Sequence, residues 1–290
     1  MKKLILVIMM MVFAGVLLTG CGEGNTVSES NGDSATGTGE ESTDSDAAED
    51  EVENADADVV ENEAEVRIYL VRHGKTWFNT TGQVQGFSDS PLTETGIEQA
   101  ILVGENMKDI KFTTAYSSSL GRQKSTTKYI LAENSHEVPD IVEVDGLKEW
   151  NYGGYEGKTN EEMWQPIFEQ NGLELDEEWS QYAQLVEILG DGGIADAIAS
   201  NDTENMAETY EEITTRAKTA MEQITKETLA AGGGNVLAVS SGGQIPTILE
   251  TIVPGQYQGE AIGNCTVTIL TYKNGEYTLE IAGDESYLAE

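Results

Sequence analysis

From residue 65 onward, hydrophobic residues follow two alternating patterns. Short β-branched and apolar runs, typical of buried strands, occur at residues 66–71, 114–117, 141–144 and 236–239. Stretches with an apolar residue at every third or fourth position, typical of amphipathic helices, occur at residues 93–108, 118–133 and 209–231. Strands that alternate with helices of this length predict a three-layer α/β/α fold around a mostly parallel central sheet.

Two further segments add to this predicted core. Residues 266–272 and 277–282 are joined by Asn274-Gly275, which predicts a β-hairpin at the edge of the sheet. Residues 158–207 are acidic with scattered aromatic residues, which predicts an insertion of short helices. Such an insertion at the carboxyl edge of the sheet would form a lid or side wall over that edge. For any single one of its aromatic residues, a plain hydrophobic core is the favoured interpretation.

The first residues have the pattern of a secretory signal. Two lysines follow Met1, and residues 4–18 are almost wholly apolar but too few for a comfortable membrane span. The segment Leu18-Thr19-Gly20-Cys21 then resembles a bacterial lipobox. We therefore expect residues 1–20 to be a lipoprotein signal peptide and Cys21 to carry the lipid on the extracytoplasmic side of the membrane. An ordinary cleaved signal or a transmembrane anchor are the alternatives.

The segment that follows is strongly acidic. Residues 22–65 contain no Lys, Arg or aromatic residue, so residues 21–64 are expected to be a disordered tether for a domain that spans residues 65–290. The net charge of −36 argues against binding to nucleic acid or adhesion to anionic lipid. With Cys21 lipidated, Cys265 has no partner for a disulfide, and the few Cys and His residues do not support a zinc site. We expect no cofactor and no metal.

Candidate chemistry lies at the end of the first predicted strand. Ligands of open α/β sheets bind beyond the carboxyl ends of the strands, which is where Arg72 and His73 lie. The planar fork of Arg72 suits a phosphate, and a neutral His73 has a ring nitrogen that can carry a phosphoryl group. These two residues alone would also fit a solvent-facing cation and a loop histidine.

The surrounding motifs favour the chemical interpretation. The first motif is Arg72-His73-Gly74-x-Thr76-x-x-Asn79, followed by Pro91-Leu92-Thr93-x-x-Gly96. Two later motifs are Ser117-Ser118-x-x-x-Arg122 and Leu147-x-Glu149-x-x-x-Gly153-x-x-Glu156-Gly157. Together they resemble the histidine phosphatase superfamily, also called the phosphoglycerate mutase-like family, over residues 65–282. The resemblance implies a phosphoglycerate mutase-like fold and chemistry on phosphate monoesters.

The resemblance also implies a role for each site residue. His73 would attack phosphorus and form a phosphohistidine, and Glu149 would act as the general acid. Arg72 and Arg122 would hold the phosphoryl oxygens, and Asn79 would add a neutral donor. His73, Arg122 and Glu149 each follow a different predicted strand, so the topology brings them to one edge of the sheet. Singly, Arg122 and Glu149 would also fit surface charges.

One position departs from the family pattern. After the fourth strand the family carries Ser-His-Gly, whereas this chain carries Ser240-Ser241-Gly242, so the second histidine is absent. Ser241 and the backbone at Gly242 would still donate hydrogen bonds to a phosphate. His136 belongs to a surface loop at the amino edge of the sheet and cannot substitute. Loss of a charged donor is expected to slow turnover roughly ten- to a thousandfold.

The sequence thus predicts a membrane-tethered, extracytoplasmic phosphomonoesterase that acts on a small phosphorylated molecule. The alternative is a non-catalytic lipoprotein that binds a phosphate ligand or forms a surface interaction. Retention of His73, Glu149 and both arginines favours the enzyme, and Ser241 favours the alternative. Mutase activity is less expected, because the lipobox places the domain away from phosphorylated cytoplasmic metabolites.

Overall fold

The computed structural model of the protein describes residues 64–289. The predicted signal peptide (residues 1–20), the lipidation site Cys21 and residues 21–63 of the predicted tether lie outside this range. These predictions therefore stay predictions. Within residues 64–289, no helix combines the length and the apolarity that crossing a membrane requires.

A mixed sheet of six strands forms the centre of the described domain, with the strand order β3-β2-β4-β1-β5-β6. The neighbours among β1 to β4 pair in parallel, and β5 and β6 run antiparallel at one edge, which confirms the predicted mostly parallel sheet and its hairpin. The strands are β1 (Val66–Arg72), β2 (Phe112–Ser117), β3 (Ile141–Glu143), β4 (Gly234–Ser240), β5 (Val267–Lys273) and β6 (Glu276–Asp284).

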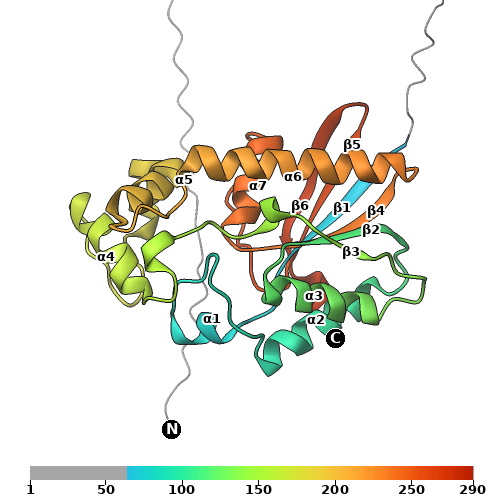
Figure 1. Ribbon diagram of the computed structural model, residues 1–290, viewed down its shortest axis with the longest axis horizontal. Helices are drawn as coiled ribbons and strands as arrows, with labels where there is room; N and C mark the ends of the chain where they lie inside the picture. The colour runs from blue at the N-terminus through green and yellow to red at the C-terminus, as the bar shows by residue number, and fades with distance from the viewer. Residues whose placement is uncertain (1–63, 290) are drawn as a thin grey trace, which may run out of the picture. The chain divides into compact units, whose positions relative to one another are not determined.

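Strand β1 lies at the centre because it is apolar on both faces. Ile68 and Leu70 pack on one face against helices α6 (Tyr210–Ala230) and α7 (Gln244–Ile252). On the opposite face, β1 packs against helices α2 (Glu94–Met107) and α3 (Gly121–Ala132). Figure 1 shows α6 and α7 on one side of the sheet and α2 and α3 on the other. The predicted three-layer α/β/α architecture is confirmed.

Local signals set the ends of these elements. Thr93 caps α2 by accepting a hydrogen bond from the N–H of Gly96, and Thr209 forms a capping box with Glu212 at the start of α6. At the hairpin, Asn274 and Gly275 both have positive φ (53° and 88°), as a two-residue turn between antiparallel strands requires. The predicted helix starts near residues 93 and 209 and the predicted turn are confirmed, whereas the helix predicted from residue 118 begins at Gly121.

The insertion consists mainly of α4 (Asn160–Gln170) and α5 (Tyr182–Asn201), with Gly190 at a kink inside α5. Its apolar residues form a separate cluster, distinct from the two clusters that flank the sheet. Trp164, Trp179 and Tyr182 pack edge to face, with ring centroids 5.5 to 5.9 Å apart. Most of the aromatic residues of the insertion therefore build its own core. The short helix α1 (Trp77–Thr81) lies in the loop after β1.

Candidate active site

His73 lies directly beyond the carboxyl end of β1, beside the end of β4. Its backbone N–H donates to the carbonyl of Ser240 at 3.0 Å, and Arg72 pairs with Ser240 in the parallel register. The turn after His73 is tightly packed, because a Cβ added at Gly74 would lie 2.4 Å from the carbonyl oxygen of Gly96. Glycine at position 74 thus lets the chain leave the strand and present His73 at the sheet edge.

Hydrogen bonding determines which ring nitrogen of His73 carries the proton. Nδ1 lies 2.9 Å from the carbonyl oxygen of Gly74, and a carbonyl can only accept, so Nδ1 is protonated and Nε2 has a free lone pair. Burial lowers the pKa of His73 well below its usual range, and the positive charges of Arg122 and Arg72 lower it further. The side chain is 3% exposed. His73 is therefore a neutral imidazole with one nitrogen available as a nucleophile.

Arg72 is held against the turn that follows β4. One of its terminal nitrogens donates to the carbonyl of Ile262 at 2.7 Å, and its buried Nε has no partner among the described residues. A Cβ added at Gly242 would lie 3.0 Å from the guanidinium carbon. Gly242 thus permits the guanidinium to lie close to the backbone, and Arg72 keeps a donor free for an anion.

Arg122 begins α3, and its side chain is buried. Its two terminal nitrogens donate to the carbonyls of Gln85, Gly86 and Ser88 and to the carboxylate of Asp89. Only Nε, which is buried, has no partner within residues 64–289. Arg122 therefore contributes a positive charge and a single N–H to the site, while its terminal fork holds the loop 85–89 in place.

Glu149 faces the start of α7. Its Oε2 accepts from the backbone N–H of Gly243 at 2.8 Å and its Oε1 from that of Trp150 at 3.0 Å. The residue is 7% exposed. Both oxygens are thus positioned by the backbone rather than by a flexible side chain. The charge of Glu149 acts on both Arg72 and Arg122, which places the carboxylate in the same group as the two arginines.

Arg216 on α6 supports the backbone around Glu149. Its terminal nitrogens donate to the carbonyls of Gly146, Lys148 and Glu149, and its guanidinium forms an ion pair with Glu208 at 2.8 Å. Arg216 was not predicted as a site residue, because a lone arginine in an amphipathic helix has no distinguishing local pattern. It fixes the loop that carries the proposed general acid.

Ser241 is buried at the end of β4, and its Oγ lies 2.6 Å from Nε2 of Gln123. Gln123 follows Arg122 on α3 and was also missed by the sequence analysis. The available signal in the sequence was a glutamine directly after the predicted site residue Arg122. Ser241, which stands where the family has its second histidine, thus contacts a polar side chain of α3.

Asn79 and Asn264 link the loops that flank His73. Oδ1 of Asn79 accepts from the N–H of Thr76 at 3.1 Å and lies 3.4 Å from Nδ2 of Asn264. Nδ2 of Asn264 also donates to the carbonyl of His73 at 2.9 Å. The side-chain nitrogen Nδ2 of Asn79 donates to no group within residues 64–289, so it is free to donate to a ligand. By contrast, His136 is exposed on the loop before β3, as predicted.

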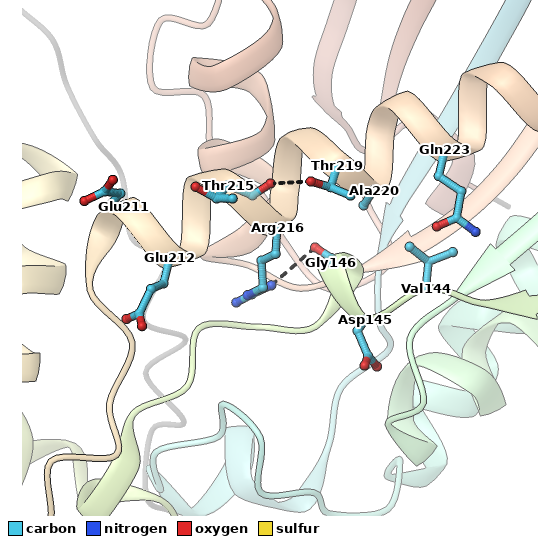
Figure 2. A pocket seen from close by; sticks show the side chains of 10 residues that line it. All are labelled: Val144, Asp145, Gly146, Glu211, Glu212, Thr215, Arg216, Thr219, Ala220 and Gln223. Atoms are coloured by element: carbon cyan, nitrogen blue, oxygen red, sulfur yellow. Dashed lines mark hydrogen bonds between the residues drawn. The ribbon is translucent and has the colours of Figure 1, made fainter.

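Two pockets accompany these residues. A pocket of about 220 Å³ adjoins Asn79 and is lined by Phe78, Asn79, Gly82, Gln83, Val84, Gln85, Tyr152, Asn160, Met163 and Trp164. A larger pocket of about 560 Å³ lies between α6 and residues 144–146. Figure 2 shows this second pocket, in which Arg216 reaches the carbonyl of Gly146. None of the predicted site residues lines this second pocket, whereas the first pocket includes Asn79. The described residues contain no group of three or more His, Cys, Asp or Glu side chains placed to hold a metal ion.

Comparison with known proteins shows the family of the chain. The family model of the histidine phosphatase superfamily (branch 1) matches residues 68–285. The chain is 28% identical to the metal-independent phosphoserine phosphatase of Arabidopsis thaliana over 79% of this chain and 87% of that protein. It is 30% identical to the probable phosphoglycerate mutase GpmB of Salmonella arizonae, over 77% and 95% of the two chains. The crystal structure of phosphoglycerate mutase from Bacillus anthracis superposes with a TM-score of 0.72 at 33% identity, covering 79% of this chain and 97% of that one.

Proposed function

Because the chain belongs to the histidine phosphatase superfamily, we propose that it hydrolyses phosphate monoesters through a phosphohistidine at His73. The observation that carries this proposal is the hydrogen bond from Nδ1 of His73 to the carbonyl of Gly74, which leaves Nε2 unprotonated. The low pKa of His73 supports it, since a neutral imidazole is the nucleophilic form.

The proposed reaction has two steps. Nε2 of His73 attacks phosphorus, the bond from phosphorus to the ester oxygen breaks, and a protonated Glu149 carboxyl donates its proton to the departing oxygen. A water molecule then attacks phosphorus, the bond between phosphorus and Nε2 of His73 breaks, Glu149 accepts a proton from this water, and inorganic phosphate leaves. The charges of Arg72 and Arg122 stabilise the phosphoryl oxygens in both steps.

Ser241 lowers the expected rate. A neutral hydroxyl stabilises developing negative charge less than an imidazolium does, which would cost about ten- to a thousandfold in turnover. We therefore propose a slow phosphatase. A second candidate is a domain that binds a phosphate ligand without turnover, and the absence of a histidine at position 241 is the observation that favours it.

The pocket beside Asn79 suggests where the alcohol portion of the substrate would lie. Its ten lining residues include no charged side chain and include the apolar groups of Phe78, Met163 and Trp164. Such a lining favours a neutral, partly apolar alcohol over one that bears a carboxylate. The substrate would then differ from those named for the phosphoserine phosphatase and phosphoglycerate mutase relatives.

We further propose that the domain acts outside the cytoplasm, tethered to the membrane by lipid at Cys21. The basic start, the apolar run at residues 4–18 and the lipobox-like segment support this location. The acidic residues between Cys21 and the domain would keep it at a distance from an anionic membrane surface.

The test is intact mass spectrometry after mixing the protein with p-nitrophenyl phosphate at a pH where phosphohistidine persists. Wild type should gain one acid-labile phosphoryl group and release p-nitrophenol, and His73→Ala should do neither. His136→Ala, which changes the exposed loop histidine, is the matched control and should behave as wild type. Phosphorylation that survives His73→Ala would overturn the mechanism. Binding of inorganic phosphate with no phosphohistidine and no product would favour the binding candidate.

A further inference from the structure

Gln123 is a fully buried polar side chain whose hydrogen bonds are all made to neighbouring elements. Its Oε1 accepts from the hydroxyl of Ser118, and its Nε2 donates to the carbonyl of Leu147 at 3.1 Å and to Oγ of Ser241 at 2.6 Å. Gln123 and Ser241 are both 0% exposed. The amide therefore connects α3, the loop before Glu149 and the turn after β4.

The partners of Gln123 determine which way its amide points. The carbonyl of Leu147 can only accept, so the NH2 group of Gln123 must face it, and the same NH2 group faces Ser241. On the other side, the hydroxyl of Ser118 donates to Oε1 while accepting from the N–H of Leu120. Rotating the amide would set its oxygen against the Leu147 carbonyl. The carbonyl of Leu147, which can only accept, thus fixes the orientation of the Gln123 amide.

This orientation constrains the hydroxyl hydrogen of Ser241. Because Oγ accepts from Gln123, its own hydrogen must point elsewhere, and this hydroxyl donates no hydrogen bond within residues 64–289. The residues on either side of Ser241 contact the proposed nucleophile region: Ser240 accepts from the N–H of His73, and Gly242 lies against the guanidinium of Arg72. A phosphoryl group on His73 would be the acceptor that this hydrogen lacks.

We propose that Gln123 is a positioning residue that directs the Ser241 hydroxyl hydrogen at the phosphoryl group, so that the two residues together replace the missing histidine. The inference rests on the proposed function at His73. It also has a packing consequence. With Nε2 of Gln123 only 2.6 Å from Ser241 Oγ and both side chains buried, an imidazole at position 241 would overlap Gln123. Ser241→His alone therefore gains no activity, whereas Ser241→His with Gln123→Ala has room for the ring.

The first test is a double-mutant cycle measured as kcat and KM for p-nitrophenyl phosphate. Gln123→Met keeps the volume of the side chain but cannot donate, and Ser241→Ala removes the hydroxyl. Each single variant should lower kcat about tenfold and change KM less than about threefold, because the lost interaction strengthens in the transition state. The double variant should be no slower than Ser241→Ala, since Gln123 acts only through Ser241. Multiplying losses would show that Gln123 has only a structural role and would overturn the inference.

The second test uses the packing consequence and does not depend on Gln123→Met folding well. Gln123→Ala/Ser241→His should exceed the kcat of Gln123→Ala by at least about tenfold, and Ser241→His alone should not exceed wild type. A gain from Ser241→His alone would contradict the overlap. If wild type showed neither turnover nor phosphohistidine, the proposed function would fail on its own. The affinity for inorganic phosphate, measured for the same single and double variants, would then test whether Gln123 acts through Ser241. If it does, the double variant should lose no more affinity than Ser241→Ala.

Discussion

Gly243 donates its backbone N–H to Oε2 of Glu149 at 2.8 Å, and a Cβ added at Gly243 would lie 2.6 Å from Oε1 of the same carboxylate. The start of α7 therefore approaches Glu149 closely because residue 243 lacks a side chain. Its φ of −85° is accessible to any residue, so the glycine is needed for space and not for backbone conformation. The proposed general acid is positioned by a contact that a single methyl group would displace.

Gly243→Ala tests this relationship directly. The methyl group should push the Glu149 carboxylate out of position and lower kcat for an aryl phosphate by at least about tenfold, the effect expected when a general acid is misplaced. Gly193→Ala, which meets only the side chain of Leu189 within α5, is the control. Steady-state kinetics of both variants provide the measurement. Equal kcat values for Gly243→Ala and wild type would mean that Glu149 does not act in the reaction.

A second prediction concerns Arg216. The guanidinium of Arg216 donates to three backbone carbonyls and pairs with Glu208, and a lysine ammonium cannot reproduce this set of hydrogen bonds. Arg216→Lys should therefore lower the free energy of unfolding by about 2 kcal/mol. It should also lower kcat, because the loop that carries Glu149 would lose this support. Chemical denaturation and kinetics measure the two effects. Lys218→Met removes a pair with Glu222 that is 4.0 Å long with both side chains 65% exposed, and should change stability by less than about 0.5 kcal/mol. If Arg216→Lys and Lys218→Met lowered the free energy of unfolding by similar amounts, Arg216 would have no special role.

The low pKa of His73 predicts the pH dependence of activity. Burial, reinforced by Arg122 and Arg72, lowers the pKa of His73 well below 6.5, so the imidazole stays neutral as the pH falls through 6.5. The acid limb of kcat/KM that belongs to His73 should therefore lie below pH 6.5. A pH–rate profile with a one-proton acid limb at or above pH 6.5, assigned to His73, would contradict the buried neutral state.

The same shift has a consequence for stability. Between the folded pKa of His73 and 6.5 the unfolded chain binds more protons than the folded chain, so the free energy of unfolding falls as the pH is lowered through this window. Above 6.5 this contribution is constant. Denaturation of wild type and His73→Asn across the window measures it, and His73→Asn should show the shallower decline. Parallel curves would mean that His73 is not held neutral in the folded state.

The membrane anchor is tested by Cys21→Ser. If residues 1–20 are a lipoprotein signal, the substituted protein should either appear in the medium or accumulate as an uncleaved precursor, because serine cannot carry the thioether-linked lipid. Fractionation and intact mass of the expressed protein distinguish these outcomes. Processing and membrane retention equal to those of the wild type would contradict the anchor.

The sequence by itself determined most of the elements and supplied the candidate site residues. The spacing of apolar residues located β1, β4, α2 and α6, since one buried face imposes a fixed period on a strand or a helix. The helix starts at residues 93 and 209 were predicted from the spacing of apolar residues, and Thr93 and Thr209 cap these helices through contacts with the next few residues. His73 follows β1 directly, Arg122 lies in the first turn of the helix after β2, and Glu149 lies in the loop after β3, so the motifs could predict all three as site residues.

Tertiary structure alone decided the contacts that join distant elements. Gln123 meets Ser241 across 118 residues of sequence, and Asn264 meets the His73 carbonyl across 191. These contacts follow from the strand order, which sets β2 beside β4 and β5 beside β1. The spacing of apolar residues along an element shows which of its faces is buried, but not which other element packs on that face. The polar partners of Ser241 and Glu149 were therefore fixed only when α3, α6 and α7 packed on the sheet.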